Sequence, residues 1–485
     1  MPLSQPNPSV VSAGPPDGDA PRIAASRNGR VAPDRDAILT RQAERESSAR
    51  TYARWLDIVP VRAAGAEIEA ADGRTYLDCL SGAGALALGH NHPEVVAALQ
   101  RTLASGAMLH ALDLATPEKD AFTTALRASL PAGFRATDPK LHFCGPAGTD
   151  AVEAAIKLAQ TVTGRQGILS FTGGYHGMTL GALAASGGVA AKTAVSGIAA
   201  DVTRLPYPYP YRCPFGVGAE SAAVSARFVE RLLDDPKGGV VPPALLLVEV
   251  VQGEGGVVPA PHAWLREIRR ITAERGILMV VDEVQTGVGR TGTTWAHEAS
   301  GIVPDAIVMS KAIGGGLPLA VVAYRGEHDG WAPGAHTGTF RGNALAMVAG
   351  ATTLGIVARD GLAERAAVLG ARIRGELDAA VGELPWVGEI RGRGLMIGIE
   401  LVDPGAEPDA IGSRPAAPAL AAEVRRACLD QGVIIELGGR RDAVLRLMPP
   451  LVLSDGQADR VVRVLGDALR AVDSRTAQVA RPESA

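Results

Sequence analysis

Lysines that could take part in chemistry are few, because only six residues of this sequence are lysine. Lys311 differs from the other five, since it directly follows the apolar run DAIVMS and precedes AIGGG. An amine at the end of a buried strand is partly desolvated, which lowers its pKa and favours Schiff-base formation. A lysine that extends from a strand end into solvent would show the same pattern, so Lys311 needs support from its neighbours.

A carboxylate offers that support, because Asp282 ends the apolar run ILMVVD within VVDEVQTGVGRTG. A carboxylate at such a place is costly unless a cation pairs with it. A protonated pyridine nitrogen is one such cation, and keeping it protonated makes the ring an electron sink. A Walker-B-like magnesium site is the alternative, but the sequence contains no G-x-x-x-x-G-K-[ST] loop.

Two glycine-rich segments add an anion site and an aromatic side chain. FCGPAGTDAVEAAIK (143–157) predicts a strand, a glycine turn and a helix that opens near Thr149, where free amide groups could bind a phosphate. FTGGYHGMT (171–179) places Tyr175, with His176 next to it, after another strand, where its ring could stack on a planar cofactor. Core packing of Tyr175 and a surface position for His176 would explain this segment equally well.

Short apolar runs alternate with amphipathic helical patterns through the middle of the chain. The predicted strands are 141–144, 167–172, 244–251, 277–283, 305–310 and 318–324, and the predicted helices include 150–162 and 263–276. Continuously apolar strands separated by helices indicate a mostly parallel sheet covered on both faces. Ligands of such sheets bind at the carboxyl ends of the strands, where Lys311 and Asp282 lie.

The composition and the patterns together predict five segments. Residues 1–36 are rich in Pro, Ser, Gly and Asp and should form a disordered lead-in, and residues 474–485 should form a tail. Between them we expect the N-terminal part of a small domain at 37–95 and a large cofactor-binding domain at 96–342. An α+β pattern at 343–473 predicts the C-terminal part of the small domain.

The composition also argues against several classes of protein. A net charge of −4 over 485 residues gives no reason to expect nucleic acid or an anionic membrane as partner, and no apolar run is long enough to span a membrane. The four cysteines show no C-x-x-C spacing, and the N-terminus lacks the apolar core of a secretory signal, so we expect a cytoplasmic location. His90-Asn91-His92 lacks a third ligand, so we expect no metal site.

The motifs taken together resemble a known family. GTDAVEAAIK, GGYHG, VEVVQGEGG, VDEVQTG, SKAIGGG and TGTFRGN, in this order and spacing, resemble the class III aminotransferases, which are pyridoxal-phosphate enzymes of fold type I. The resemblance runs from about Leu77 to Leu451. It implies an α/β fold with a large domain, whose mostly parallel sheet is flanked by helices, and a smaller α+β domain. Within the family, LSGAGALALGHNHP and PYRCPFG are most similar to the members that act on diaminobutyrate and 2-oxoglutarate.

The resemblance implies pyridoxal 5'-phosphate as cofactor and assigns three residues to its reactive parts. Lys311 holds the cofactor through a Schiff base and later moves a proton. Asp282 pairs with the pyridinium nitrogen, and Gln285 lies near the phenolic oxygen.

Five further cofactor contacts follow from the resemblance. Tyr175 stacks on the ring with His176 beside it, and Gly148 and Thr149 contact the phosphate. Thr339 reaches the phosphate from the partner subunit, so a homodimer with shared active sites is expected by analogy.

The substrate side follows from the resemblance too. Glu249 and Glu254 correspond to two family glutamates, and Arg446 corresponds to the arginine that binds the α-carboxylate of 2-oxoglutarate. Glu254 pairs with Arg446 while an ω-amino substrate is bound, and a purely structural ion pair is the alternative. Many relatives have arginine where this sequence has Met178, which leaves the site of the second carboxylate open and argues against 4-aminobutyrate as donor.

The implied reaction moves the terminal amine of L-2,4-diaminobutyrate to 2-oxoglutarate, giving L-aspartate 4-semialdehyde and L-glutamate. The reaction is reversible, and we expect net flow toward diaminobutyrate. Ornithine, acetylornithine, lysine or a diamine remains open as the donor. An aminomutase, a racemase and a catalytically inactive binding protein of the same fold are further alternatives.

Overall fold

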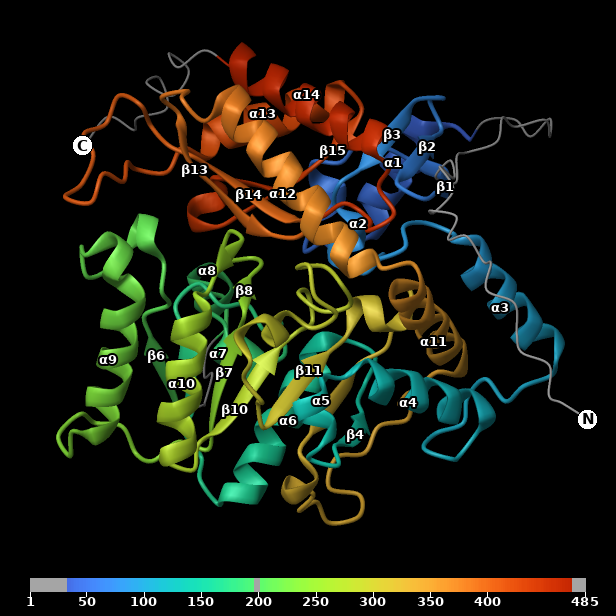
Figure 1. The fold of residues 1–485 in the computed structure, drawn as a ribbon. Helices are drawn as coiled ribbons and strands as arrows, with labels where there is room; N and C mark the ends of the chain where they lie inside the picture. Colours follow the sequence, from blue (N-terminus) through green and yellow to red (C-terminus); the bar gives the residue numbers. More distant parts are fainter. Residues whose placement is uncertain (1–32, 196–200, 473–485) are drawn as a thin grey trace, which may run out of the picture.

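The computed structural model describes residues 33–195 and 201–472 (Figure 1). The predicted lead-in therefore lies outside the described residues up to position 32, as does the predicted tail at 474–485. The lead-in prediction is wrong at its C-terminal end, because α1 (Arg35–Arg45) already begins there. Asp34 caps this helix by accepting a hydrogen bond from the Ala37 amide at 3.0 Å, which satisfies one of the free amides of its first turn.

A seven-stranded sheet with the order β4-β12-β11-β10-β7-β5-β6 forms the centre of the lower half of Figure 1. Its strands are β4 (Lys140–Phe143), β5 (Ile168–Phe171), β6 (Val202–Leu205), β7 (Leu245–Glu249), β10 (Leu278–Asp282), β11 (Ala306–Met309) and β12 (Val321–Tyr324). Only β12 is antiparallel to its neighbours, β11 and β4, and the other pairs are parallel. The predicted mostly parallel sheet is confirmed.

All six predicted strands are present, and their ends differ from the predicted ones by at most three residues. The run 244–251 divides after β7, and its last residue starts a short hairpin of β8 (Val251–Gln252) and β9 (Val258–Pro259). Strand β6 was missed because three of its four residues are only half-buried and its sequence, VTRL, is partly polar. The predicted helices correspond to α6 (Gly148–Thr163) and α10 (His262–Glu274).

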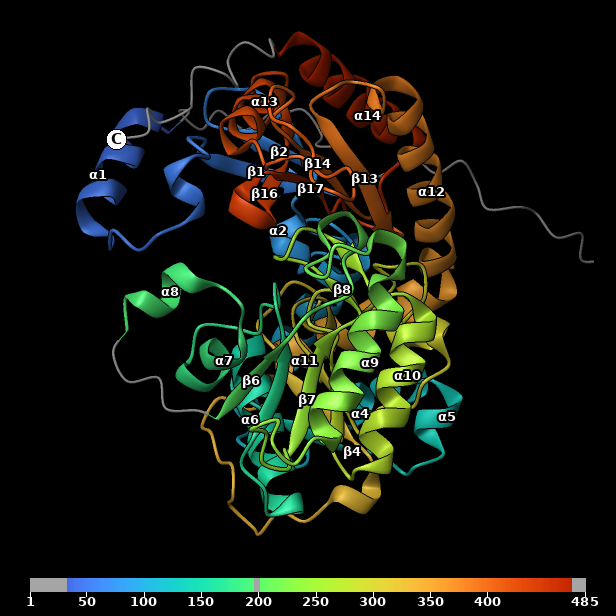
Figure 2. The ribbon, with the colours of Figure 1, turned by 90° about the vertical axis from the view of Figure 1, so that its left-hand side faces the viewer.

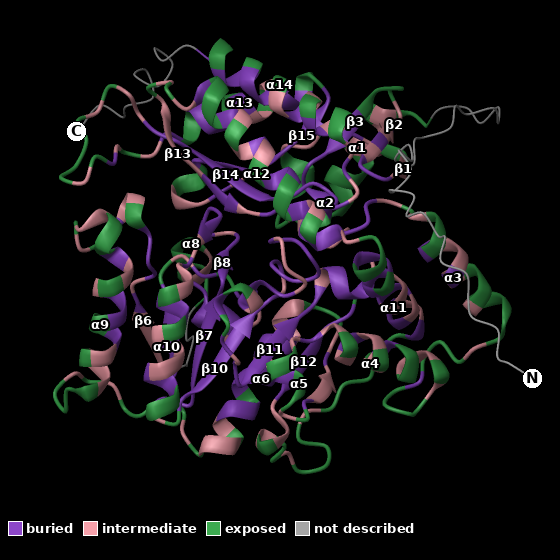
Figure 3. Ribbon diagram, in the orientation of Figure 1, coloured by how far each residue is buried: buried purple, intermediate pink, exposed green. Residues whose placement is uncertain are grey.

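Alternating side chains of the central strands enter different cores, as the pleat of a strand requires. Leu245 and Leu247 pack into a cluster with α6, whereas Leu246 and Val248 pack into a cluster with α10. The five inner strands are buried at every position, and the exposed residues lie on the helices and loops outside the sheet (Figure 3). Helices α6 and α7 (Leu180–Ala185) cover one face, and α9 (Ser221–Asp234) and α10 cover the other (Figure 2).

The upper half of Figure 1 combines segments from both ends of the chain. Antiparallel strands β1 (Pro60–Ala64), β2 (Glu67–Ala70) and β3 (Thr75–Asp78) form a sheet with β15 (Val433–Ile434), which is parallel to β3. A second, antiparallel sheet has the order β13 (Val387–Arg393), β14 (Met396–Leu401), β17 (Val444–Leu447) and β16 (Glu436–Gly438). Helices α12 (Leu362–Val381), α13 (Pro418–Asp430) and α14 (Asp455–Ala471) pack with these sheets.

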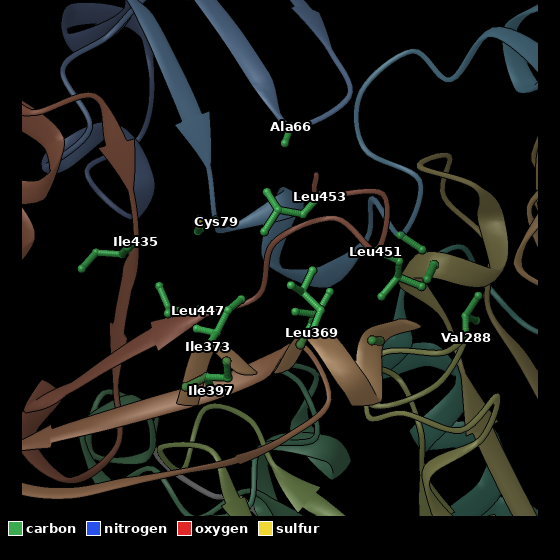
Figure 4. Close-up of a cluster of buried hydrophobic side chains, with 14 of the residues drawn as sticks. Ala66, Cys79, Val288, Leu369, Ile373, Ile397, Ile435, Leu447, Leu451 and Leu453 are labelled. Carbon is green, nitrogen blue, oxygen red and sulfur yellow. The ribbon is translucent and has the colours of Figure 1, made fainter. Parts of the chain in front are cut away.

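The apolar core of this upper half continues into the lower half. Figure 4 shows Ala66, between β1 and β2, and Cys79, directly after β3, in one cluster with Leu447 and Leu453 of the C-terminal part, and Val288 of the lower half at its edge. Such shared packing fixes the two halves relative to each other, which matters because they both contribute to the site described below.

The predicted domain boundaries stay predictions. Helix α11 (Ala344–Arg359) follows the proposed boundary at 342, yet it packs on α3 (Pro93–Ala104) and α4 (Pro117–Ser129) in the lower half. None of the described helices is by itself long and apolar enough to cross a membrane, and only α11 and α12 taken together, with a 66° bend between them, reach that length and composition.

Candidate active site

The strand pleat places two carboxylates on the same face of the sheet. Glu249 and Asp282 end β7 and β10 and lie directly opposite each other in the register of these parallel strands. Glu249 comes two residues after Leu247, and Asp282 comes two residues after Val280. Leu247 and Val280 pack against α6, and side chains two residues apart in a strand share a face, so both carboxylates lie on the face that α6 covers. Two acids at the carboxyl ends of adjacent central strands are thus brought below the N-terminus of a helix.

A cavity of about 270 Å³ opens at this place. It is lined by the candidate residues Gly148, Thr149, Tyr175, His176, Glu249, Glu254, Asp282, Gln285 and Lys311, and also by Met178. The structure therefore gathers residues that are up to 163 positions apart in the sequence, between Gly148 and Lys311, around one space.

Lys311 begins the short helical turn Lys311–Gly314 directly after β11, with a positive φ of 51°. Such a backbone conformation is uncommon for a residue with a side chain and is often found at functional sites. Burial lowers the pKa of the Lys311 amine, and the charge of Arg446 adds to this, whereas Glu254, Asp282 and Glu249 oppose it. An amine with a lowered pKa is more readily available as a nucleophile and as a base.

Asp282 and His176 form a buried pair, with Asp282 Oδ2 2.8 Å from His176 Nδ1. The other carboxylate oxygen, Oδ1, accepts a hydrogen bond from the Val284 amide at 3.0 Å. The alternative of a surface position for His176 is wrong, because this residue is only 4% exposed and its amide donates to Ser186. His176 thus orients the carboxylate rather than facing solvent.

Glu249 connects two turns of the site. Its carboxylate accepts hydrogen bonds from the Tyr175 amide at 2.8 Å and from the Gly253 amide at 2.9 Å. Burial raises the pKa of Glu249 to about 7; the negative charge of Asp282 adds to the rise, and His176 opposes it. The turn that carries the Tyr175 ring and the turn that leads to Glu254 are held by the same side chain.

The N-terminus of α6 and the turn at Gly177 form a small cradle. Thr149 donates a hydrogen bond to Thr179, whose hydroxyl donates in turn to Glu153, both at 2.6 Å. Gly177 has a φ of +127°, and a Cβ there would lie 2.3 Å from Thr149 Oγ1. Only glycine permits this close approach, which leaves the amides at the start of the helix open to an anion.

Glu254, which lines the cavity, forms a bidentate ion pair with Arg446, which lies behind the lining, with N–O distances of 2.8 and 2.9 Å. Burial acts to raise the pKa of Glu254, but the Arg446 guanidinium and, to a lesser degree, Lys311 hold it below its usual value. Gln285 lies next to this pair: its amide nitrogen is 3.5 Å from Glu254 and 3.3 Å from the Ala83 carbonyl, while its oxygen is buried without a partner.

Thr339 is not brought to the cavity by this chain. It is exposed in the segment before α11, and neighbouring Phe340 is 69% exposed. The expected contribution of Thr339 from a partner subunit stays a prediction.

The sequence analysis missed four residues of this region. Glu153 and Thr179 support the cradle, and Glu153 could have been found because it follows Thr149 by four residues on one helix face. Tyr52 and Glu436 lie near Glu254 and Arg446, as the electrostatic influence of both acids on the Tyr52 phenol indicates. No local pattern indicates either of them, since both come from elements that meet the site only in the folded chain.

Comparison with known proteins decides the family. A family model described as Aminotransferase class-III matches residues 47–469. The chain belongs to the class III aminotransferases. It is 52% identical, over 92% of its length and 94% of the relative, to a Rhizobium meliloti (strain 1021) protein named diaminobutyrate--2-oxoglutarate aminotransferase. A Haemophilus influenzae protein of the same name is 46% identical over 90% of this chain, with 96% of that relative covered.

Solved structures of aminotransferases share the fold. A Bacillus anthracis aminotransferase has a TM-score of 0.79 and 25% identity, with 90% of this chain and 98% of that chain covered. An amine transaminase from an uncultivated Pseudomonas species, in its form with bound pyridoxal phosphate, has a TM-score of 0.77 and 28% identity, with 88% and 97% covered. The α/β fold of type I is confirmed, and the cofactor of this class III aminotransferase is pyridoxal 5'-phosphate.

The residues of the cavity match this cofactor in charge and shape. The open amides of α6 and the glycine at 177 suit a phosphate, and the buried Asp282 carboxylate suits a protonated ring nitrogen. Tyr175 lines the cavity with 43% of its surface exposed, so one face of its ring is available for stacking. The Lys311 amine has no hydrogen-bond or ion-pair partner in the described part of the chain and is free to react.

Proposed function

We propose that this aminotransferase moves the terminal amine of L-2,4-diaminobutyrate to 2-oxoglutarate, giving L-aspartate 4-semialdehyde and L-glutamate. The observation that carries this substrate assignment is the 52% identity to the Rhizobium meliloti protein of that name, which extends over 92% of this chain. The reaction is reversible, and net flow toward diaminobutyrate stays a prediction.

The residues around the reacting centre have separate tasks in this proposal. When bound, pyridoxal phosphate supplies an aldehyde that condenses with the donor amine and a ring that accepts an electron pair from the substrate carbon. Lys311, with its lowered pKa, would take the proton from that carbon as a base and deliver it, as an acid, to the former aldehyde carbon, so that the amine stays on the cofactor. Asp282, oriented by His176, keeps a proton on the ring nitrogen by holding a negative charge beside it.

The Glu254–Arg446 pair lets one site serve two kinds of substrate. While the donor's terminal amine reacts, Glu254 occupies both ends of the Arg446 guanidinium and leaves no free cation there. The α-carboxylate of glutamate or 2-oxoglutarate competes for the same bidentate geometry and displaces Glu254. Met178 lines the cavity where an arginine would bind a second carboxylate, which disfavours 4-aminobutyrate as donor.

We further propose that the protein acts as a cytoplasmic homodimer in which Thr339 of each chain serves the site of the other. An exposed apolar patch supports the dimer: Met108, Leu112 and Leu114 are each at least half exposed, and His110 of the same segment packs edge-on against Phe340 at 5.2 Å. Exposed apolar patches of this kind mark protein interfaces. Thr339 adjoins the patch and would be placed within it.

A donor panel tests the substrate. The purified holoenzyme is supplied with 2-oxoglutarate and, in separate assays, with L-2,4-diaminobutyrate, ornithine, acetylornithine, lysine or 4-aminobutyrate, and glutamate formation is measured. We expect kcat/KM to be about tenfold or more higher for diaminobutyrate than for any other donor. A higher value for ornithine, or amine transfer that needs no oxo acid, would overturn the proposal.

A further inference from the structure

A second carboxylate, Glu436, lies beside the Glu254–Arg446 pair. β16 and β17 are antiparallel, and Glu436 is directly opposite Arg446 in their register. Opposite residues of such a pair project from the same face of the sheet. Glu436 therefore projects from the same face of this sheet as Arg446, which binds Glu254 of the cavity lining.

Arg446 forms no direct ion pair with this second acid in the described part of the chain. Both ends of its guanidinium bind Glu254, and its Nε and Nη2 atoms each lie 3.3 Å from the Leu437 carbonyl. The guanidinium passes over Gly438, where a Cβ would lie only 2.6 Å from Nε. The absent side chain at Gly438 thus leaves room for the Arg446 guanidinium where it meets Glu254 and the Leu437 carbonyl.

Glu436 consequently keeps unused acceptor capacity. In the part of the chain that the structure describes, Glu436 forms no ion pair, and its Oε1 accepts only from the adjacent Leu437 amide at 3.1 Å. Its Oε2 is buried without any partner, and the residue is 7% exposed. A buried carboxylate in this state is costly, and a cation that arrives with a ligand removes that cost.

The charges around Glu436 agree with a missing cation. Burial raises the pKa of Glu436, Arg446 and Arg425 lower it, and Glu254 raises it further. Burial, followed by the charges of Glu436 and Glu254, also raises the pKa of the Tyr52 phenol to about 12. Of the two arginines near Glu436, Arg446 is engaged by Glu254, and neither arginine forms an ion pair with Glu436 in the described residues, so the charge of Glu436 lacks a direct partner.

We propose that Glu436 binds the α-ammonium group of the donor and thereby selects diamino acids over ω-amino acids that lack this group. The inference rests on the proposed function. L-2,4-Diaminobutyrate carries an ammonium and a carboxylate at its non-reacting end, so it brings the cation that Glu436 lacks. Glutamate has a single amine, which is the reacting one, so its half-reaction makes no use of Glu436.

Glu436→Gln tests this proposal, because it keeps the shape of the side chain and removes its charge. Single-turnover half-reactions of the holoenzyme are followed by the absorbance of the cofactor with L-2,4-diaminobutyrate, 1,3-diaminopropane, 4-aminobutyrate and L-glutamate. We expect kcat/KM to fall about tenfold or more for the two diamines, mainly through KM, and to stay unchanged for 4-aminobutyrate and glutamate. Glu436→Asp, which keeps the charge at shorter reach, should retain part of the preference.

Glu389→Gln is the matched control, since Glu389 is a partly buried glutamate of the same sheet whose partner is Arg391 at 2.8 Å, away from the cavity lining. It should leave all four half-reactions unchanged. Equal losses for diamines and glutamate in Glu436→Gln, or no loss for the diamines, would overturn the role of Glu436. A wild-type enzyme that does not prefer diaminobutyrate would instead contradict the proposed function, so the two failures are distinguishable.

Discussion

Among the single residues of the site, Glu249 is the acid whose protonation changes near neutral pH. Burial, with Asp282 adding, raises its pKa to about 7, whereas an unfolded glutamate titrates near 4.5. The folded protein thus binds more protons than the unfolded protein between these values, so this residue's contribution to stability is lost as the pH rises through about 7. The full loss is about 3 kcal/mol at most.

Glu249→Gln removes this pH dependence. We expect the free energy of unfolding of the variant, relative to wild type, to shift in favour of the variant by up to about 3 kcal/mol between pH 5 and pH 8. Urea unfolding of the cofactor-free proteins at several pH values measures the shift. The substitution also removes one hydrogen-bond acceptor for the Tyr175 or Gly253 amide, which changes the stability of the variant by the same amount at every pH. A stability difference between variant and wild type that is constant from pH 5 to pH 8 would therefore contradict the prediction.

The local sequence predicted the functional residues that lie at the ends of buried strands. Lys311 and Asp282 each end or follow an apolar run, and the cavity lies where those strand ends meet. Glu436 could not be found in this way, because its role depends on a cross-strand neighbour, Arg446, and on a glycine two residues along its own strand. The position of Tyr52 likewise depends on contacts between segments more than 200 residues apart.

At the scale of elements, the start of α6 depends on a turn from another segment. Gly177→Ala would place a Cβ 2.3 Å from Thr149 Oγ1 and force an alanine to a φ of +127°. We expect this variant to bind pyridoxal phosphate about tenfold or more weakly. The added methyl group would push Thr149 away from Thr179 and displace the amides at the start of α6, which bind the phosphate. Titration of the cofactor-free protein with pyridoxal phosphate, followed by fluorescence, gives the dissociation constant.

Gly188→Ala is the control for that substitution, since Gly188 has an ordinary φ of −65° and no atom within 4 Å of a Cβ at this position. It should bind the cofactor as wild type does. Equal affinities for the Gly177→Ala and wild-type proteins would show that the phosphate does not depend on this turn.

Elements with a continuous apolar pattern were predicted well, and those without it were not. Successive side chains of β7 and β10 enter two different apolar cores. The sequences of these strands are therefore almost continuously apolar and easily recognised. β6 lies at the sheet edge with half-buried polar residues, and β3 pairs with β15 across more than 350 residues. The local pattern of apolar residues in a sequence shows neither that a strand lies at a sheet edge nor that it pairs with a segment so far along the chain.

At the largest scale, one chain brings together every candidate residue except Thr339, with Arg446 reaching the cavity lining through its ion pair with Glu254. The exposed segment that carries Thr339 adjoins the segment 108–114, to which it is joined by the Arg341–Asp113 ion pair at 3.1 Å and by the contact of His110 with Phe340. The proposed homodimer requires a two-fold axis near this surface, because Thr339 must reach the site of the other chain.

Mixing two inactive chains tests this arrangement. A chain with Lys311→Ala lacks the reactive amine, and a chain with Thr339→Asp places a carboxylate where a phosphate should bind, so each should be inactive alone. If Thr339 acts across the dimer, the mixed dimer has one intact site, and co-expression should restore about a quarter of wild-type activity. Lys311→Ala mixed with Asp282→Asn is the control: both residues come from the same chain, so no site is intact. No recovery with Thr339→Asp, or recovery no greater than in the control, would contradict a contribution of Thr339 across the dimer.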